Sequence, residues 1–139
     1  MRIFYLRDET NFPTACVATE KEDDGQIRFA VSTWNPVDEF SRSMARRIAI
    51  GRLDAKNRGW SINGPPYDYA LTCSFNVKAR IVLTIAENDH LLYPQRTVKA
   101  AILWLVNKCF LPAHVGTWLK PTYYNRKKAE IDVLLRNLG

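Results

Sequence analysis

The fold is decided by residues 35–58, NPVDEFSRSMARRIAIGRLDAKNR, which have the pattern of one long amphipathic helix. Asn35 is a good N-cap and Pro36 suits the first helical position, so the helix is expected to begin here. At about 100° per residue, one arc of this helix collects the side chains of Phe40, Met44, Ile48, Gly51 and Ala55. We expect this arc to pack on the rest of the domain.

The other side of this predicted helix carries an excess of positive charge. Arg42 and Arg46 lie one turn apart and point away from the apolar arc. The basic residues of the stretch are Arg42, Arg46, Arg47, Arg52, Lys56 and Arg58. An excess of one sign is typical of a surface that binds a polyanion, such as the phosphates of a nucleic acid. The alternative is a solvated helix face with no ligand, and the sequence leaves both interpretations open.

Segments before this helix have the alternating pattern of β-strands. The predicted strands are residues 2–6, 14–19 and 27–33, and Asp24-Gly25 is a typical hairpin turn between the last two. After the helix, residues 69–75 and 77–85 also alternate, so we predict two more strands there. The second of these contains Ala-Arg-Ile-Val-Leu, which is also compatible with a helix.

Helical spacing returns in the second half of the chain. Residues 94–110 and 128–138 are predicted helices, and the first is apolar enough to be buried on most sides. Residues 57–68 contain two Gly and two Pro, so we expect a loop there, and this loop holds Trp60. The sequence therefore predicts an α+β fold, a small antiparallel sheet with about three helices packed on it, in a single domain that covers residues 1–139.

A second informative stretch is HVGTWLKPTYYNRKK, residues 114–128. Gly116 and Pro121 argue against regular structure in its first half. Its rings and cations are interleaved without any acidic residue, and they are Trp118, Lys120, Tyr123, Tyr124, Arg126, Lys127 and Lys128. Rings that stack on bases, next to cations that neutralise phosphates, are the features that bind single-stranded nucleic acid. The alternative is a loop whose rings pack beneath it, and Trp60 has the same two interpretations.

Length and composition are those of a folded, basic domain. The chain has 139 residues, 47% of them hydrophobic, and four Trp, which is enough for a buried core. Its net charge of +6 favours a polyanionic partner. Three widely spaced cysteines among apolar neighbours indicate reduced, mostly buried thiols in a cytoplasmic protein. No segment has the apolar length of a signal peptide or a bilayer span, so no membrane association is expected.

The residue types that enzymes use are scattered along the sequence. The two histidines, His90 and His114, lie far apart, and no Cys or His spacing suits zinc. No Gly-rich phosphate loop precedes a helix, and no nucleophile elbow is present. We therefore expect no catalytic residues, no metal site and no cofactor. The alternative is a nuclease that assembles a metal site from carboxylates distant in the sequence.

Residues 29–53, FAVSTWNPVDEFSRSMARRIAIGRL, resemble a pattern of small phage-encoded proteins. In that pattern a strand leads into Asn-Pro, Phe-Ser-Arg, a basic pair and Ile-Ala-x-Gly-Arg-Leu. In size, basicity and aromatic loops, the chain is similar to the Drc-type single-stranded DNA-binding cofactor of a phage RNA polymerase. This resemblance implies binding to melted promoter DNA, recruitment of phage RNA polymerase and a location in the host cytoplasm. It carries no individual binding residues over to this sequence.

Together these features predict a non-catalytic protein that binds single-stranded DNA with little sequence preference. Phosphates are expected at the basic residues of the two stretches, and bases at Trp60, Trp118, Tyr123 and Tyr124. The alternative is a small phage protein that binds a host or phage protein and never touches nucleic acid. Under that alternative, the C-terminal stripe of Leu134, Leu135 and Leu138 is a candidate contact, as it is for a homo-oligomer.

Overall fold

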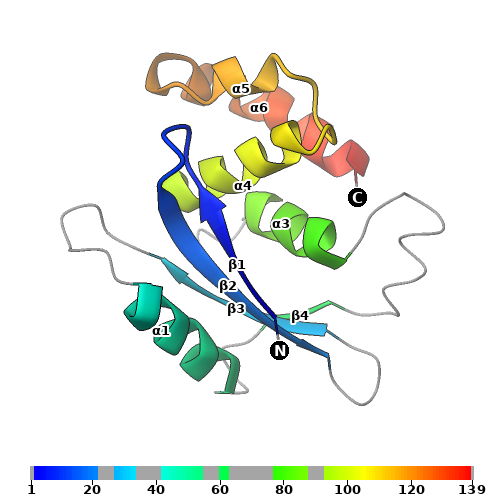
Figure 1. Cartoon of the computed structure of the whole chain (residues 1–139). Helices are drawn as coiled ribbons and strands as arrows, with labels where there is room; N and C mark the ends of the chain where they lie inside the picture. The colour runs from blue at the N-terminus through cyan, green and yellow to red at the C-terminus, as the bar shows by residue number, and fades with distance from the viewer. Residues whose placement is uncertain are drawn as a thin grey trace.

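A four-stranded antiparallel sheet with helices on both faces forms the domain (Figure 1). The computed structural model describes residues 2–21, 27–33, 42–54, 60–62, 77–87 and 93–138. The strands lie in the order β1 (Arg2–Arg7), β2 (Pro13–Lys21), β3 (Ile27–Thr33) and β4 (Trp60–Ile62). The helices of the described residues are α1 (Arg42–Asp54), α3 (Val77–Glu87), α4 (Gln95–Asn107), α5 (Val115–Trp118) and α6 (Pro121–Leu138). This arrangement confirms the predicted α+β class.

Both faces of the sheet are buried because alternate strand residues meet different helices. Leu6, Val17 and Phe29 are fully buried in the main core, which α3, α4 and α6 complete on one face. Cys16 and Ala30 point to the opposite face, where α1 covers them. Figure 1 shows α1 on one side of the sheet and the other described helices on the opposite side, where α5 contacts α4, and α6 contacts α3 and α5. The sheet and α4 therefore separate α1 from α5 and α6.

Helix α1 packs through a different side from the one predicted. Met44 and Ile48 of the predicted arc are 51% and 39% exposed, whereas Ala49 is fully buried and Ala45 packs beside it. The predicted arc is therefore wrong by one residue, which corresponds to a rotation of about 100°. The cause is the facing sheet surface, whose side chains are small, so that two alanines allow the closest approach. The Ser32 hydroxyl donates a 2.8 Å hydrogen bond to the Ala45 carbonyl and fixes this contact.

Other parts of the predicted helix lie outside the described residues. These are the start at Asn35 and Pro36, and the arc positions Phe40 and Ala55. The predicted Asp24-Gly25 turn and the strand at residues 69–75 also lie outside them.

Enlarging Ala49 is expected to destabilise the fold. Ala49→Leu adds carbon atoms between α1 and the sheet, where no space is open, and should lower the free energy of unfolding by about 2 kcal/mol. Ile48→Leu is the matched control on the exposed side, and its effect should stay within about 0.5 kcal/mol. Urea denaturation monitored by circular dichroism measures both variants. A larger loss for Ile48→Leu would show that the predicted arc packs after all.

Residues 77–85 form helix α3, so the strand predicted there is wrong. Ala79, Ile81, Val82, Leu83 and Ile85 are all fully buried, because α4, α6 and the main core surround the helix. The partly exposed Arg80, Thr84 and Glu87 follow helical spacing, but the apolar residues between them also alternate, which is the pattern that predicted a strand.

Three further predictions are corrected by the structure. Trp60 lies in strand β4, not in a loop, and β4 pairs antiparallel with β3 through Phe29 and Trp60. Residues 115–118 form the short helix α5 despite Gly116. The last helix, α6, begins at Pro121 and not at residue 128, as a proline in the first turn permits.

The apolar stripe of α6 packs within the chain. Ile131 and Leu135 are buried, and Leu134 and Leu138 pack against the main core. This packing removes the observation that made the stripe a candidate oligomer or partner contact. Among the described residues, no helix combines the length and apolar character needed to cross a bilayer.

Candidate nucleic-acid interface

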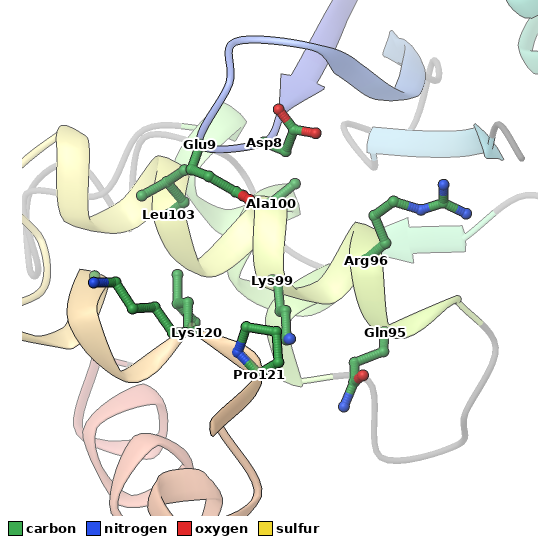
Figure 2. Close-up of a pocket in the computed structure, with 11 residues that line it drawn as sticks. Asp8, Glu9, Gln95, Arg96, Lys99, Ala100, Leu103, Lys120 and Pro121 are labelled. Atoms are coloured by element: carbon green, nitrogen blue, oxygen red, sulfur yellow. The ribbon is translucent and has the colours of Figure 1, made fainter. Parts of the chain in front are cut away.

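A pocket of about 440 Å³ lies between the tip of the β1–β2 hairpin and helices α4, α5 and α6 (Figure 2). Its lining residues are Asp8 and Glu9 of the hairpin tip, Gln95, Arg96, Lys99, Ala100 and Leu103 of α4, and Gly116, Leu119, Lys120 and Pro121 around the α5–α6 turn. The volume falls within the usual range for pockets that bind small organic groups. Three segments that are distant in sequence thus form one concave site, which we call the α4–α6 pocket.

Three cations line the α4–α6 pocket. Arg96 and Lys99 come from the first turns of α4, and Lys120 directly precedes α6. Within the described part of the chain, no ion pair to any of the three is formed. The Lys99 ammonium instead lies 4.6 Å from the centre of the Tyr124 ring. The positive ends of the α4 and α6 dipoles add to these charges, so the pocket favours an anion.

Of the two acidic residues that line the pocket, Asp8 is held by hydrogen bonds within the hairpin turn. Asp8 Oδ1 accepts hydrogen bonds from the Thr10 amide at 2.9 Å, the Thr10 hydroxyl at 2.6 Å and the Phe12 amide at 3.0 Å. Asn11, with φ of 65°, completes this three-residue loop. Burial by itself raises the pKa of Asp8. The hydrogen bonds from Thr10 and Phe12, together with the charge of Arg96, outweigh burial and leave this pKa lowered.

The lowered pKa predicts an acid-dependent contribution of Asp8 to stability. A carboxyl whose pKa is lower in the folded state stabilises the fold at pH values above its ordinary pKa of 3.8. This stabilisation is lost as the pH falls through the folded-state pKa. Asp8→Asn keeps an accepting oxygen but removes the charge, so it should be less stable than the wild type at pH 7. Thermal melting at a series of pH values should show this difference vanishing below pH 3.8. A constant difference at every pH would contradict this role of the charge.

Rings and cations also meet at the corner between α5 and α6. The Trp118 ring lies edge-on to His114, with centroids 4.8 Å apart, and the Lys127 ammonium lies 5.0 Å from its centre. The Arg126 guanidinium lies 5.3 Å from the centre of the Tyr123 ring, which is 40% exposed. Tyr123 is two residues beyond Pro121 at the pocket rim. The corner therefore extends the positive charge of the pocket and adds accessible aromatic surface.

One residue of the predicted aromatic–basic stretch does not have the predicted role, and two of its lysines form ion pairs within α6. Tyr124 is only 4% exposed and belongs to the main core, so its predicted stacking on a base is wrong. Burial raises the pKa of its hydroxyl, against the charge of Lys128 and together with that of Asp132. Lys128 is 2.6 Å from Asp132 in an i,i+4 ion pair whose side chains are 41% and 42% exposed. Lys127 also approaches Glu130 at 3.4 Å, but both are solvent-accessible and such pairs are weak.

The predicted basic helix lies on the other face of the sheet from this corner. Arg46 and Arg47 are exposed and line a separate hollow of about 470 Å³ with Ser43 and Ile50. Arg42 and Arg52 belong to helix α1, whereas Lys56 and Arg58 fall outside the described residues. The structure therefore does not bring the two predicted basic stretches onto one surface.

Sequence reasoning missed Arg96 and Lys99. Both lie on a helix that was predicted to be buried on most sides because of its apolar stripe. Their spacing with Leu103 is i, i+3 and i+7, which places the three on one face of α4. Two basic residues at the start of an otherwise apolar helix were the feature of the sequence that could have indicated this site.

The described residues contain no group of three or more His, Cys, Asp or Glu side chains placed to hold a metal ion. Comparisons with protein families, with curated proteins and with solved structures return no match to this chain.

Proposed function

We propose that this protein binds single-stranded DNA, without catalysis and with little sequence preference, on the surface formed by α4, α5 and α6. The observation that carries this proposal is the α4–α6 pocket, where three cations without ion-pair partners among the described residues lie close to the exposed Tyr123 ring and the half-buried Trp118 ring. Cationic grooves beside stacking rings are the shared feature of proteins that hold single strands. A duplex offers its phosphates but not the faces of its bases, so the rings favour an unpaired strand.

The chemistry of each side chain determines whether it is assigned to a phosphate or to a base. Arg96, Lys99 and Lys120 hold phosphates in or at the pocket, through charge-assisted contacts. Tyr123 and Trp118 each offer a ring to a base, which contributes about 1–3 kcal/mol per stacked base. Arg126 and Lys127, which lie over these rings in the free protein, are placed to turn to the adjacent phosphates.

Fluorescence anisotropy with a labelled oligothymidine, compared with a duplex of equal length, tests the proposal. Five cations are assigned to phosphates, so the logarithm of the association constant should fall against the logarithm of salt concentration with a slope of about −3.5. Single-stranded DNA should bind more tightly than duplex because of the rings. Equal affinity for both forms would refute the stacking roles, and absence of binding at low salt would refute the function.

The resemblance of residues 29–53 to the Drc-type cofactor makes melted promoter DNA the proposed target and phage RNA polymerase the proposed partner. A duplex with a central unpaired bubble should bind more tightly than the same duplex fully paired. Addition of phage RNA polymerase should then form a ternary complex on the bubble in a mobility-shift experiment. Bubble binding without a ternary complex would retain strand binding and remove the polymerase partner.

One observation favours the alternative that the chain binds a protein partner. Met44 and Ile48 are exposed on α1, one turn apart, on the far side of the sheet from the α4–α6 pocket. Exposed apolar side chains next to one another are typical of protein contacts. Under this alternative no strand binds at low salt, so the anisotropy experiment separates the two functions.

A further inference from the structure

A second group of cations and rings lies on the other side of the hairpin tip. The ammonium groups of Lys78 and Lys108 each lie 5.8 Å from the centre of the Trp104 indole. Lys78 is also 4.6 Å from the centre of the Phe4 ring. On the neighbouring edge strand β1, the Arg7 guanidinium lies 5.9 Å from the centre of the Tyr5 ring. We call these residues the β1-edge cluster.

The charges of the β1-edge cluster are uncompensated in the described residues. Both ammonium groups lie over the same Trp104 ring, and burial together with the nearby charge of Lys108 lowers the pKa of Lys78. None of the described carboxylates forms an ion pair with Lys78, Lys108 or Arg7. Asp8 and Glu9 are the acidic residues that line the pocket next to this cluster, and the carboxylate of Asp8 is held by hydrogen bonds within the hairpin turn. An anion placed between the cations would relieve their repulsion.

Lys108 is held beside Trp104 by the way in which α4 ends. Lys108 is the C-cap, and Cys109 follows it in the left-handed conformation with φ of 65°. The Phe110 amide then donates a 2.9 Å hydrogen bond to the Leu105 carbonyl, as in a Schellman motif. This turn stacks Phe110 on Trp104, with centroids 6.2 Å apart. It also leaves Cys109 exposed, although its apolar neighbours predicted burial.

Four residues of the β1-edge cluster line a pocket that adjoins the α4–α6 pocket, and Lys78 lies beside one of them, Trp104. This second pocket has a volume of about 530 Å³, and Tyr5, Arg7, Trp104 and Lys108 are among its lining residues. Asp8, Glu9 and Leu103 line both pockets, so the two lie on either side of the hairpin tip along one face of α4. A polymer with regularly spaced negative charges could occupy both, whereas a single small anion could not.

We propose that the β1-edge cluster is a second phosphate-binding site, and that one single strand passes from the α4–α6 pocket around the hairpin tip to reach it. This inference rests on the proposed function and extends it by setting the path and the length of the bound strand. The Trp104 and Tyr5 rings lie beside the cations at this site and line the same pocket. Strands too short to reach around the tip bind the α4–α6 pocket alone.

Oligothymidines of two lengths, about 4 and about 16 nucleotides, test the path. Lys78→Gln combined with Lys108→Gln removes two phosphate contacts from the long strand alone. The affinity of the variant for the long strand should fall about tenfold, and the negative slope of its association constant against salt should become shallower by about 1.4. Binding of the short strand should be unchanged. Arg46→Gln combined with Arg47→Gln removes the same charge from α1, and should change neither length beyond about twofold.

Each outcome of this experiment has one interpretation. If the long strand binds the wild type and the lysine variant with the same affinity and salt slope, the second site is refuted and the proposed function stands. If both lengths weaken equally in the lysine variant and in the arginine control, the effect is one of net charge, and the second site is again refuted. If the wild type binds neither length, the proposed function itself is refuted. Thermal melting of both variants, expected to match the wild type, confirms that the variants fold.

Discussion

Replacing Tyr124 by alanine is expected to lower the free energy of unfolding by about 3 kcal/mol, the cost of deleting a buried aromatic side chain. Tyr124 is 4% exposed, belongs to the main core and supports the Lys99 ammonium on its ring. Tyr124→Phe keeps the ring and should lose far less stability than Tyr124→Ala. Urea denaturation measures both variants.

The neighbouring Tyr123 provides the matched contrast. Its ring is 40% exposed, so Tyr123→Ala should change the free energy of unfolding by less than about 1 kcal/mol. The same variant should weaken single-strand binding about tenfold, through the loss of one stacked base. If Tyr124→Ala kept full stability and lost binding, the assignment of the two rings would be reversed.

The second large effect is expected from the two lysines of the α4–α6 pocket. Lys99→Gln combined with Lys120→Gln should weaken binding of a single strand about 30-fold, because each charge-assisted contact to a phosphate contributes about 1 kcal/mol or more. The salt slope should also decrease by about 1.4. Anisotropy titrations over a salt series measure both quantities.

Arg46→Gln combined with Arg47→Gln is the control for this pair as well. It removes two positive charges from exposed residues of α1, on the opposite face of the sheet. An equal loss of affinity in the control would mean that overall charge governs binding. A greater loss in the control would place the interface on α1, as the sequence first suggested.

Strands β1, β2 and β3 could be predicted from the sequence because their apolar residues alternate with the period of a sheet, whereas the three residues of β4 are too few to show it. The alternation of residues 27–33 corresponds to β3, where Phe29 and Val31 point into the main core. Apolar spacing in residues 94–110 likewise gave α4. Helix α3 could not be recognised in the same way, because Ile81, Val82 and Leu83 are buried together and the apolar residues of this segment also alternate as those of a strand do.

The orientation of α1 depends on the sheet surface that it packs against, and the sequence of the helix alone does not reveal that surface. Met44 and Ile48 form the more hydrophobic side, but the facing sheet offers Cys16, Ala18 and Ala30. Close packing of small residues on both sides excludes the bulkier face. The position of Arg46 and Arg47 relative to the rest of the chain therefore could not be read from the helix alone.

The candidate site was only partly predictable for a related reason. Trp118, Tyr123 and Arg126 were recognised because rings and cations are contiguous in the sequence. Their joining with Arg96 and Lys99 depends on how α5 and α6 fold back on α4, which is a long-range contact. The burial of Tyr124 beside the exposed Tyr123 follows from the helical start at Pro121, because adjacent residues of a helix point about 100° apart.

The most direct test of the central claim is a titration of the isotope-labelled protein with a short oligothymidine, followed by backbone amide NMR. Binding on α4, α5 and α6 predicts the largest shift changes at Lys99, Lys120 and Tyr123, and none beyond noise at Arg46 and Arg47. Shift changes confined to α1 would contradict the proposed interface. A spectrum unchanged by the oligonucleotide at low salt would contradict nucleic-acid binding altogether.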